Sequence, residues 1–123
     1  MLRQFVTAKI HGIEVTAASV EYHGSVTVGA ELLDAAGIQP YERVFIVNLN
    51  SGARWDTYAL PGDTGVFTLN GGSARLGVTG DRCVIMTFGF AEQAPGATVV
   101  FCGDENTIED VTSYPAGRCT VRG

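Results

Sequence analysis

Glycine interrupts this chain at short intervals, and its frequency limits the length of any regular element. Sixteen of the 123 residues are glycine, which is nearly twice the usual share of about 7%. Glycine tolerates the left-handed backbone of tight turns but weakens the interior of helices and strands. The sequence therefore favours many short elements joined by turns, and it predicts a turn-rich β fold.

Six segments have the composition of β-strands, because each is short, rich in β-branched and aromatic residues, and bounded by turn residues. Residues 44–47 and 83–86 are continuously apolar, which is typical of strands buried on both faces, whereas residues 54–58 alternate in character. A closed barrel accommodates both kinds of strand. The expected strands are residues 3–9, 12–17, 43–49, 54–60, 83–90 and 97–102, with 66–69 as a further candidate.

One helix is expected at residues 29–36, where the apolar side chains form a single stripe and Gly37 suits a left-handed C-terminal cap. After Cys102 the composition turns polar, so residues 103–123 are expected to form a less ordered tail or a peripheral segment. The length of 123 residues, without an internal repeat or linker, predicts one domain.

The charge balance argues against polyanionic partners. The chain has 8 basic and 13 acidic residues and a net charge of -5, whereas nucleic acids and anionic membranes select basic surfaces. No apolar run approaches the roughly 18 to 20 residues of a membrane span, and the first residues lack the apolar core of a secretory signal. We therefore expect a cytoplasmic protein that binds neither nucleic acid nor membranes.

Residue types that usually bind metals are few. The three cysteines, Cys83, Cys102 and Cys119, are widely spaced and predict neither a disulfide framework nor a zinc site. The only histidines, His11 and His23, have no metal-ligand spacing to a cysteine. Because H-E-x-x-H, G-x-S-x-G, dinucleotide and phosphate-loop motifs are also missing, we expect no metal and no bound nucleotide.

The segment Tyr22-x-Gly24-Ser25 places a serine directly after a glycine, at the end of an expected strand. By itself such a pair indicates only a turn. Taken in order and position with the rest of the chain, it resembles the pyruvoyl-dependent aspartate 1-decarboxylases over roughly residues 1–102. The other residues that carry this resemblance are Lys9, His11, Arg54, Thr57, Tyr58, Asn70 and Gly71.

The resemblance implies a mainly β fold, namely a small closed six-stranded double-psi β-barrel with short helices, assembled as a homotetramer. It implies conversion of L-aspartate to β-alanine and carbon dioxide, which supplies a precursor of pantothenate and coenzyme A. In this family the chain cleaves itself between the residues that match Gly24 and Ser25, here into residues 1–24 and 25–123. Cleavage would be either spontaneous or assisted by a maturation factor as a partner.

The implied self-cleavage needs what this segment provides. The Ser25 hydroxyl can attack the preceding carbonyl only in a strained turn, and Gly24 permits unusual backbone angles and a close approach. By resemblance, Thr57 hydrogen-bonds the Gly24 carbonyl oxygen and polarises it. The resulting ester eliminates to dehydroalanine and is hydrolysed, so that Ser25 becomes a covalent pyruvoyl group, which is the only cofactor implied.

By resemblance, this pyruvoyl group does the work of pyridoxal phosphate: it forms a Schiff base with the substrate amine and accepts the electrons released on decarboxylation. The resemblance assigns the substrate carboxylates to Arg54 and Lys9. It assigns proton donation to Tyr58. Further substrate-binding and supporting roles are implied for Thr57, Asn70, Gly71, Gly72, Ser73, His11 and Tyr22.

Two features leave alternatives open. Arg54 and Tyr58 point to one face of an expected strand and Thr57 to the other, so we expect either a bend there or contributions from different sides of a subunit contact. The pair Gly72-Ser73 departs from the alanines usual in the family and adds a hydroxyl along the substrate channel. The alternatives are a related pyruvoyl decarboxylase acting on another amino acid and, in a different class, a non-catalytic barrel used for binding.

Overall fold

The computed structural model describes residues 1–20 and 24–116, so the predicted site residue Tyr22 lies outside the described residues, as does Cys119. The described residues are mainly β-strand, which confirms the predicted fold class. They also form one α-helix, α1 (Ala30–Ala36), and two short 3-10 helices, η1 (Gly71–Arg75) and η2 (Asp104–Asn106). The strands are β1 (Arg3–Glu14), β2 (Ala17–Ser19), β3 (Ser25–Gly29), β4 (Arg43–Asn48), β5 (Arg54–Gly62), β6 (Phe67–Asn70), β7 (Arg82–Ala91), β8 (Ala97–Cys102) and β9 (Ile108–Tyr114).

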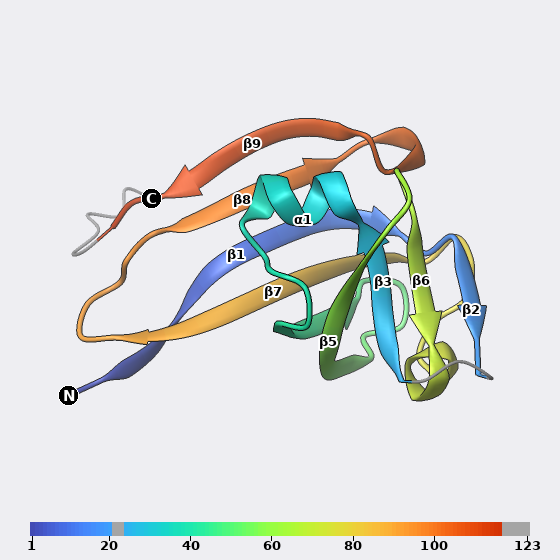
Figure 1. Cartoon of the computed structure of the whole chain (residues 1–123), viewed down its shortest axis with the longest axis horizontal. Coiled ribbons are helices and arrows are strands. Elements are labelled where there is room, and N and C mark those ends of the chain that lie inside the picture. The colour runs from blue at the N-terminus through green and yellow to red at the C-terminus, as the bar shows by residue number, and fades with distance from the viewer. Residues whose placement is uncertain (21–23, 117–123) are drawn as a thin grey trace.

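The strands pair in the order β2-β6-β3-β5-β4-β7-β1-β8-β9. Both directions of pairing occur, since β1 is antiparallel to β7 and parallel to β8, while β3 is parallel to β5 and antiparallel to β6. Figure 1 shows β7, β1, β8 and β9 side by side as long strands, with β3, β6 and β2 crossing at one end of them. The start of β3, where Ser25 lies, is therefore at the end of the molecule where the short strands gather.

The first strand differs from the prediction, because β1 runs without a break where two segments were expected. Its pairing with β7 shifts register between His11 and Ile13, and Gly12 adopts a left-handed φ of 81° at this bulge. A bulge bends a strand and re-aims its side chains without ending it. The gap expected between residues 9 and 12 is therefore continuous strand, with a bend next to Gly12.

The core lies on one face of the long strands, where Ile10, Ile46 and Ile85 are buried. Leu32 and Leu33 of α1 pack into the same cluster, so the helix covers this face beside β1 and β8. The predicted helix is confirmed, and Gly37 ends it with a φ of 78°. The opposite face of the sheet is thus left for other contacts.

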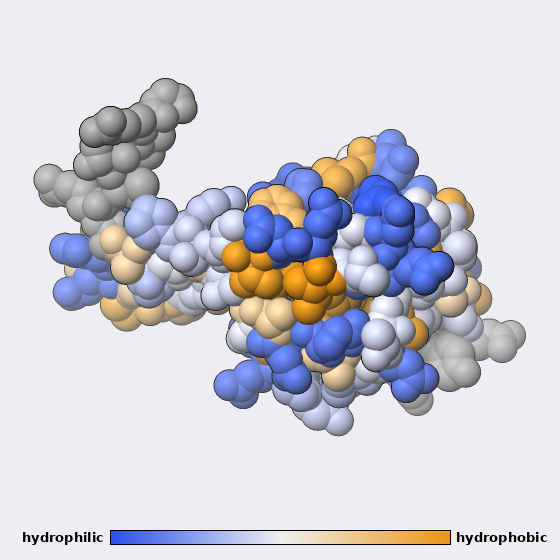
Figure 2. Space-filling model, turned by 90° about the horizontal axis from the view of Figure 1, so that it is seen from above, coloured by the Kyte–Doolittle hydropathy of each residue, from blue (hydrophilic) through white to orange (hydrophobic). Residues whose placement is uncertain are grey.

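Within the segment expected to be a less ordered tail or a peripheral segment, residues 108–114 form β9, which pairs with β8. All seven residues of β9 are exposed, so this strand lies at the periphery of the sheet. Exposed hydrophobic side chains on β9 include Ile108, Val111 and Tyr114. Figure 2, which looks down on the side where β9 lies, shows apolar side chains gathered near the middle of this face among hydrophilic ones.

Candidate active site

The predicted nucleophile, Ser25, is the first residue of β3 and lies opposite Asn70 of β6. The Asn70 Nδ2 atom donates hydrogen bonds to Ser25 Oγ at 3.1 Å and to Thr27 Oγ1 at 3.0 Å. Ser25 is 1% and Asn70 6% exposed. We call Ser25, Thr27 and Asn70, with the adjoining η1, the serine cluster; it holds the Ser25 hydroxyl in one buried position.

Gly24 and Thr57, the other residues predicted for self-cleavage, lie beside this cluster. Gly24 is exposed, and a Cβ built on it would meet nothing within 4 Å. Thr57 is half-buried on β5, which runs parallel to β3. Among the described residues, the Thr57 hydroxyl makes no hydrogen bond to the Gly24 carbonyl oxygen, so that predicted contact is not formed in this structure.

The predicted substrate-binding turn is η1. Gly71 is buried with a φ of 57°, and Gly72 is exposed with open space around its Cβ position. Ser73 is 6% exposed, and its Oγ accepts a hydrogen bond of 3.0 Å from Trp55 Nε1. The sequence motifs assign no role to Trp55, so this link between β5 and η1 is known only from the structure.

Asn48, at the end of β4, is a second residue that sequence reasoning missed. It is fully buried, and its Nδ2 donates to the Leu76 carbonyl oxygen at 3.0 Å and to Asp81 Oδ2 at 2.9 Å. These bonds fix the residue that follows η1. The Asn48 amide, together with the Val78 backbone N–H, holds the pKa of Asp81 below its ordinary value, so the carboxylate stays ionised as an acceptor.

The predicted cations lie elsewhere, on the sheet face opposite the core. Arg54 and His11 belong to one row across the sheet, through Val47 and Val84. Side chains in such a row point to the same face. We call this surface the cationic face, and it carries Lys9, His11, Arg54 and Tyr58.

Strand β5 separates the two groups of predicted residues. It pairs with β4 in unbroken register from Arg54 to Tyr58, and exposure alternates along it, with Arg54 and Tyr58 exposed and Thr57 half-buried. The predicted bend at this place is therefore absent from the structure. Thr57 points to the side of the core and Tyr58 to the cationic face, so within one chain the two cannot share a cavity.

The guanidinium of Arg54 is free of protein carboxylates. Its neighbour Asp56 is held by Arg43 at 2.8 Å, and neither Arg54 nor Lys9 makes an ion pair with any residue that the structure describes. Arg54 lines a cleft of about 210 Å³, together with Phe45, Val47 and Asp56. Because the Asp56 carboxylate is paired with Arg43, the Arg54 guanidinium is the cation of this cleft that can bind a ligand carboxylate.

The two aromatic members of the cationic face have aromatic neighbours. The His11 ring lies 5.6 Å from the Phe101 ring, and its buried Nδ1 has no hydrogen-bond partner among the described residues. The Tyr58 ring stacks on Tyr41 at 6.4 Å between centroids. Tyr58 keeps its hydroxyl on an exposed surface, where a second molecule can reach it.

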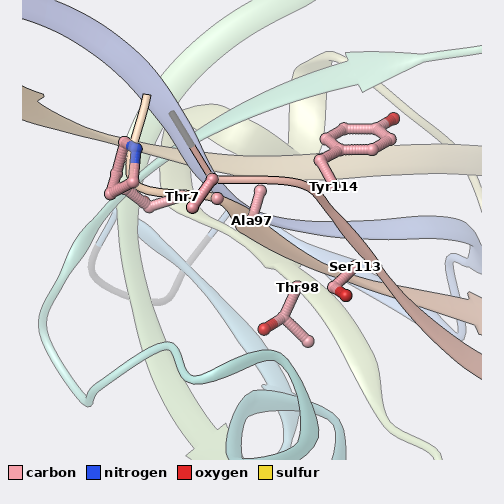
Figure 3. Close-up of a pocket in the computed structure, with 8 residues that line it drawn as sticks. Thr7, Ala97, Thr98, Ser113 and Tyr114 are labelled. Atoms are coloured by element: carbon pink, nitrogen blue, oxygen red, sulfur yellow. The ribbon is translucent and has the colours of Figure 1, made fainter. Parts of the chain in front are cut away.

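Other parts of the described chain offer fewer chemical groups. The described residues hold no group of three or more metal-binding side chains, and they include no helix long and apolar enough to cross a membrane. A cleft of about 270 Å³ between the ends of β8 and β9 is lined by uncharged residues, with Thr98 and Ser113 next to each other (Figure 3). It contains none of the predicted site residues.

Comparison with known proteins agrees with this geometry. The family model for aspartate decarboxylase matches residues 1–109. An aspartate 1-decarboxylase from Desulfotalea psychrophila is 40% identical over 119 residues, covering 90% of this chain and 98% of that protein. One from Acaryochloris marina is 47% identical over 117 residues, covering 89% of both chains. The predicted resemblance is confirmed: the chain belongs to the aspartate decarboxylase family.

Proposed function

We propose that this chain cleaves itself between Gly24 and Ser25 and then decarboxylates L-aspartate to β-alanine and carbon dioxide. The observation that carries the proposal is the buried Ser25 hydroxyl, held by the side-chain amide of Asn70. Membership of the aspartate decarboxylase family supports it, and relatives named aspartate 1-decarboxylase match nearly their whole length. Their names do not favour another amino acid or a non-catalytic role.

In maturation, the Ser25 Oγ attacks the Gly24 carbonyl carbon, and the peptide C–N bond breaks as the ester forms. The hydroxyl proton passes to the leaving nitrogen, which becomes the Ser25 α-amino group. Elimination then releases residues 1–24 with a C-terminal carboxylate, and water replaces the nitrogen, which leaves as ammonia. Asn70 donates to Oγ, so it fixes the oxygen and leaves the hydroxyl proton free to be transferred. A Cβ built on Gly24 would meet nothing within 4 Å among the described residues, so glycine is not required there by crowding. The products would be residues 1–24 and 25–123.

A pyruvoyl group would carry its ketone oxygen on the former Ser25 Cα, in place of the α-nitrogen, because Oγ leaves with the Gly24 carboxylate. The Asn70 amide beside Ser25 is a donor, which that ketone oxygen requires. When present, the group supplies a carbonyl that condenses with an amine and accepts an electron pair. Asn70 would fix that carbonyl, and the η1 backbone would line the adjoining space. The burial of Ser25 and Asn70 limits the access of water to this position.

The cationic face would bind the substrate. Aspartate has two carboxylates, and Arg54 and Lys9 are the cations there without a carboxylate partner among the described residues. Arg54 can bind a carboxylate with two hydrogen bonds, whereas Lys9 contributes a point charge. The exposed Tyr58 hydroxyl would donate the proton that replaces the lost carboxylate, and His11 would support the pair from the same row of the sheet.

The serine cluster and the cationic face meet only if two copies of the chain pack together, which supports the proposal of a homotetramer with shared sites. The cationic face also carries apolar side chains at Phe45, Met86 and Phe88, half-buried or exposed, that a second copy would cover. We propose a cytoplasmic enzyme that supplies β-alanine for pantothenate. A maturation factor remains a prediction from the resemblance.

Intact-mass spectrometry of the purified protein tests this proposal. We expect two fragments, residues 1–24 and 25–123, and release of β-alanine from L-aspartate. The Ser25→Ala variant should stay one chain of 13.0 kDa without activity. Ser51→Ala is the matched control, because Ser51 is an exposed turn residue that should not affect cleavage. Decarboxylation of aspartate by an uncut chain would contradict the proposal.

A further inference from the structure

We propose that Ser73 is a positioning residue: its hydrogen bond from Trp55 holds the η1 backbone beside Ser25, and its hydroxyl does not contact substrate. The inference rests on the proposed function, because it concerns the turn that would line the substrate. It changes the role expected for Ser73, which the sequence placed among the substrate-binding residues. Three contacts of η1 carry it.

The first part of η1 has no side chains that could restrain it by hydrogen bonds. Gly71 and Gly72 bring no side chains, and around the exposed Gly72 there is open space at the Cβ position. Glycine has the largest range of backbone conformations, so two in succession make the most mobile link of a turn. A fixed backbone at Gly71-Gly72 therefore needs contacts from the residues on either side.

Both ends of the turn are fixed from other strands. Before it, the Asn70 side chain is bound to Ser25 and Thr27 of β3. After it, the Leu76 carbonyl oxygen accepts from the fully buried Asn48 of β4. These bonds do not hold the backbone of residues 71–75, which needs a further contact to be fixed.

The Trp55–Ser73 hydrogen bond restrains this span at its middle. At 3.0 Å it joins residues 18 apart in sequence, and it is the side-chain hydrogen bond that links β5 to η1 in the described part of the chain. Ser73 is 6% exposed, so its hydroxyl is directed into the protein and is occupied by the indole N–H. A substrate above Gly72 would contact the backbone that Ser73 fixes, not the Ser73 hydroxyl.

Trp55 makes this bond measurable, because it is the only tryptophan of the chain and its fluorescence reports the environment of one indole. In the matured protein we expect Ser73→Ala to shift the emission and to raise the KM for L-aspartate by roughly 3- to 10-fold, with a smaller change in kcat. Ser113→Ala removes an exposed hydroxyl of β9, a strand that pairs with β8, and should leave both the emission and the KM unchanged.

A double-mutant cycle separates positioning from direct contact. Trp55→Phe removes the indole N–H and leaves the Ser73 hydroxyl in place, so it should raise KM as Ser73→Ala does. Adding Ser73→Ala to Trp55→Phe should then raise KM no further. Trp55→Phe also serves as the second variant if Ser73→Ala does not fold.

Three results would overturn the inference: an unchanged emission in Ser73→Ala, an unchanged KM in both single variants, or additive KM effects in the double variant. Additive effects would mean that the Ser73 hydroxyl contacts substrate by itself. Failure of the proposed function looks different, because the matured wild-type protein would then release no carbon dioxide from aspartate while the fluorescence shift still appeared.

Discussion

Arg54 differs from the nearby Arg43 because no protein carboxylate neutralises it. Asp56 is occupied by Arg43, whereas Arg54 faces a cleft without an ion pair among the described residues. A charge-assisted hydrogen bond contributes about 1.5 to 3 kcal/mol, or roughly 10- to 150-fold in binding. We therefore expect Arg54→Ala to raise the KM for aspartate by that factor in steady-state assays, and Arg54→Lys by less.

Arg3 provides the control for this prediction. It is an exposed arginine at the other end of the sheet, opposite Ala91, and Arg3→Ala removes the same charge without touching the cationic face. We expect its KM to match that of the wild type. Equal KM values for Arg54→Ala and Arg3→Ala would remove Arg54 from the substrate site.

Cys83 couples stability to alkaline pH. Burial raises the pKa of its thiol from 9.0 to about 12, and the charge of Asp81 adds to the rise. Because the folded pKa is the higher one, the full stabilisation is present below pH 9 and is lost as pH rises from 9 toward 12. At pH 10 the expected loss is about 1.4 kcal/mol.

Urea unfolding at pH 7.5 and pH 10 measures this loss. In Cys83→Ala the decrease in the free energy of unfolding between the two pH values should be smaller than in the wild type, by about 1.4 kcal/mol. Cavity formation lowers the stability of this variant at both pH values, so the difference between them isolates the thiol. An equal decrease in both proteins would show that the Cys83 thiol is not the cause.

Among single residues, the motifs pointed to the proposed reactive residues and to Asn70, which holds Ser25, but not to the Trp55–Ser73 and Asn48–Asp81 hydrogen bonds. Ser25, Arg54 and Tyr58 belong to short sequence motifs, which are recognised from residues that are close together in the chain. The Trp55–Ser73 and Asn48–Asp81 bonds join residues 18 and 33 apart, so they depend on strand pairing that no local pattern encodes. Long-range hydrogen bonds of single polar side chains need the tertiary structure to be seen.

Among the elements, η2 is attached to the sheet through one asparagine. Asn106 is 1% exposed, and its side chain bonds the Glu14 N–H at 2.7 Å, the Glu14 carbonyl oxygen at 2.9 Å and the Gly65 carbonyl oxygen at 3.0 Å. Asn106→Ala removes three bonds and should lower the free energy of unfolding by about 3 kcal/mol. Faster amide exchange in β9 should accompany the loss, because β9 follows directly.

Asn50→Ala is the comparison for that variant. Asn50 is exposed and accepts one hydrogen bond of 2.8 Å from the Arg82 N–H. Loss of this hydrogen bond should lower the free energy of unfolding by about 1 kcal/mol or less and leave amide hydrogen exchange in β9 unchanged. Similar costs for the two variants would mean that Asn106 does not anchor the segment.

Two glycines in turns allow backbone strain to be separated from crowding. Gly52 and Gly65 have left-handed φ angles of 81° and 76°. A Cβ at Gly52 meets nothing within 4 Å, whereas at Gly65 it comes within 2.9 Å of the Glu105 carbonyl oxygen. Gly52→Ala should lower the free energy of unfolding by about 1 to 2 kcal/mol because of backbone strain alone. Gly65→Ala should lower it by at least about 1 kcal/mol more, because the new Cβ also crowds the Glu105 carbonyl oxygen.

Thermal or urea unfolding of both variants checks this order. The comparison uses the same substitution at nearly the same φ, so the extra cost of Gly65→Ala measures the contact with η2. An equal cost for both would show that the Glu105 backbone moves away without penalty. A larger cost at Gly52 would contradict the assignment of open space there.

The elements were predictable wherever composition and burial agree. Buried strands such as β4 and β7 have apolar runs, and α1 has one apolar stripe. β9 was not predicted because the polar residues 103–106 just before it indicated a tail or peripheral segment, and no residue of the strand is buried. β1 was expected as two strands, residues 3–9 and 12–17, whereas the structure has one strand with a bulge beside Gly12.

For the whole molecule, family membership and the mainly β structure agree with the predicted double-psi β-barrel, which is the fold of this family. The connectivity of the barrel could be predicted only from the resemblance. Hydrophobic periodicity does not predict it, because the order of strands in a sheet depends on pairing between residues far apart in sequence. The alternation of β5, in contrast, was readable in the sequence. It predicted the separation of Thr57 from Tyr58 that the structure displays.

That separation leads to a prediction about assembly. If Ser25 of one copy works with Arg54 of another, then Ser25→Ala and Arg54→Ala remove different halves of a shared site. Each variant alone should have little activity. In co-expressed mixtures, about one quarter of the sites should combine an intact Ser25 with an intact Arg54, so activity should return to about that fraction of wild type.

The complementation assay needs mixed assemblies, so the two variants are co-expressed with different affinity tags and purified through both in turn. Intact-mass spectrometry should show that only the Arg54→Ala chains are cleaved, because only they retain Ser25. Mixing the separately purified variants just before the assay is the control, because assemblies that have not exchanged subunits contain no complete site and should stay inactive. A doubly tagged assembly without activity would mean that each site is built within one chain, and the separation of the cationic face from the serine cluster would then have to close by movement of β5 itself.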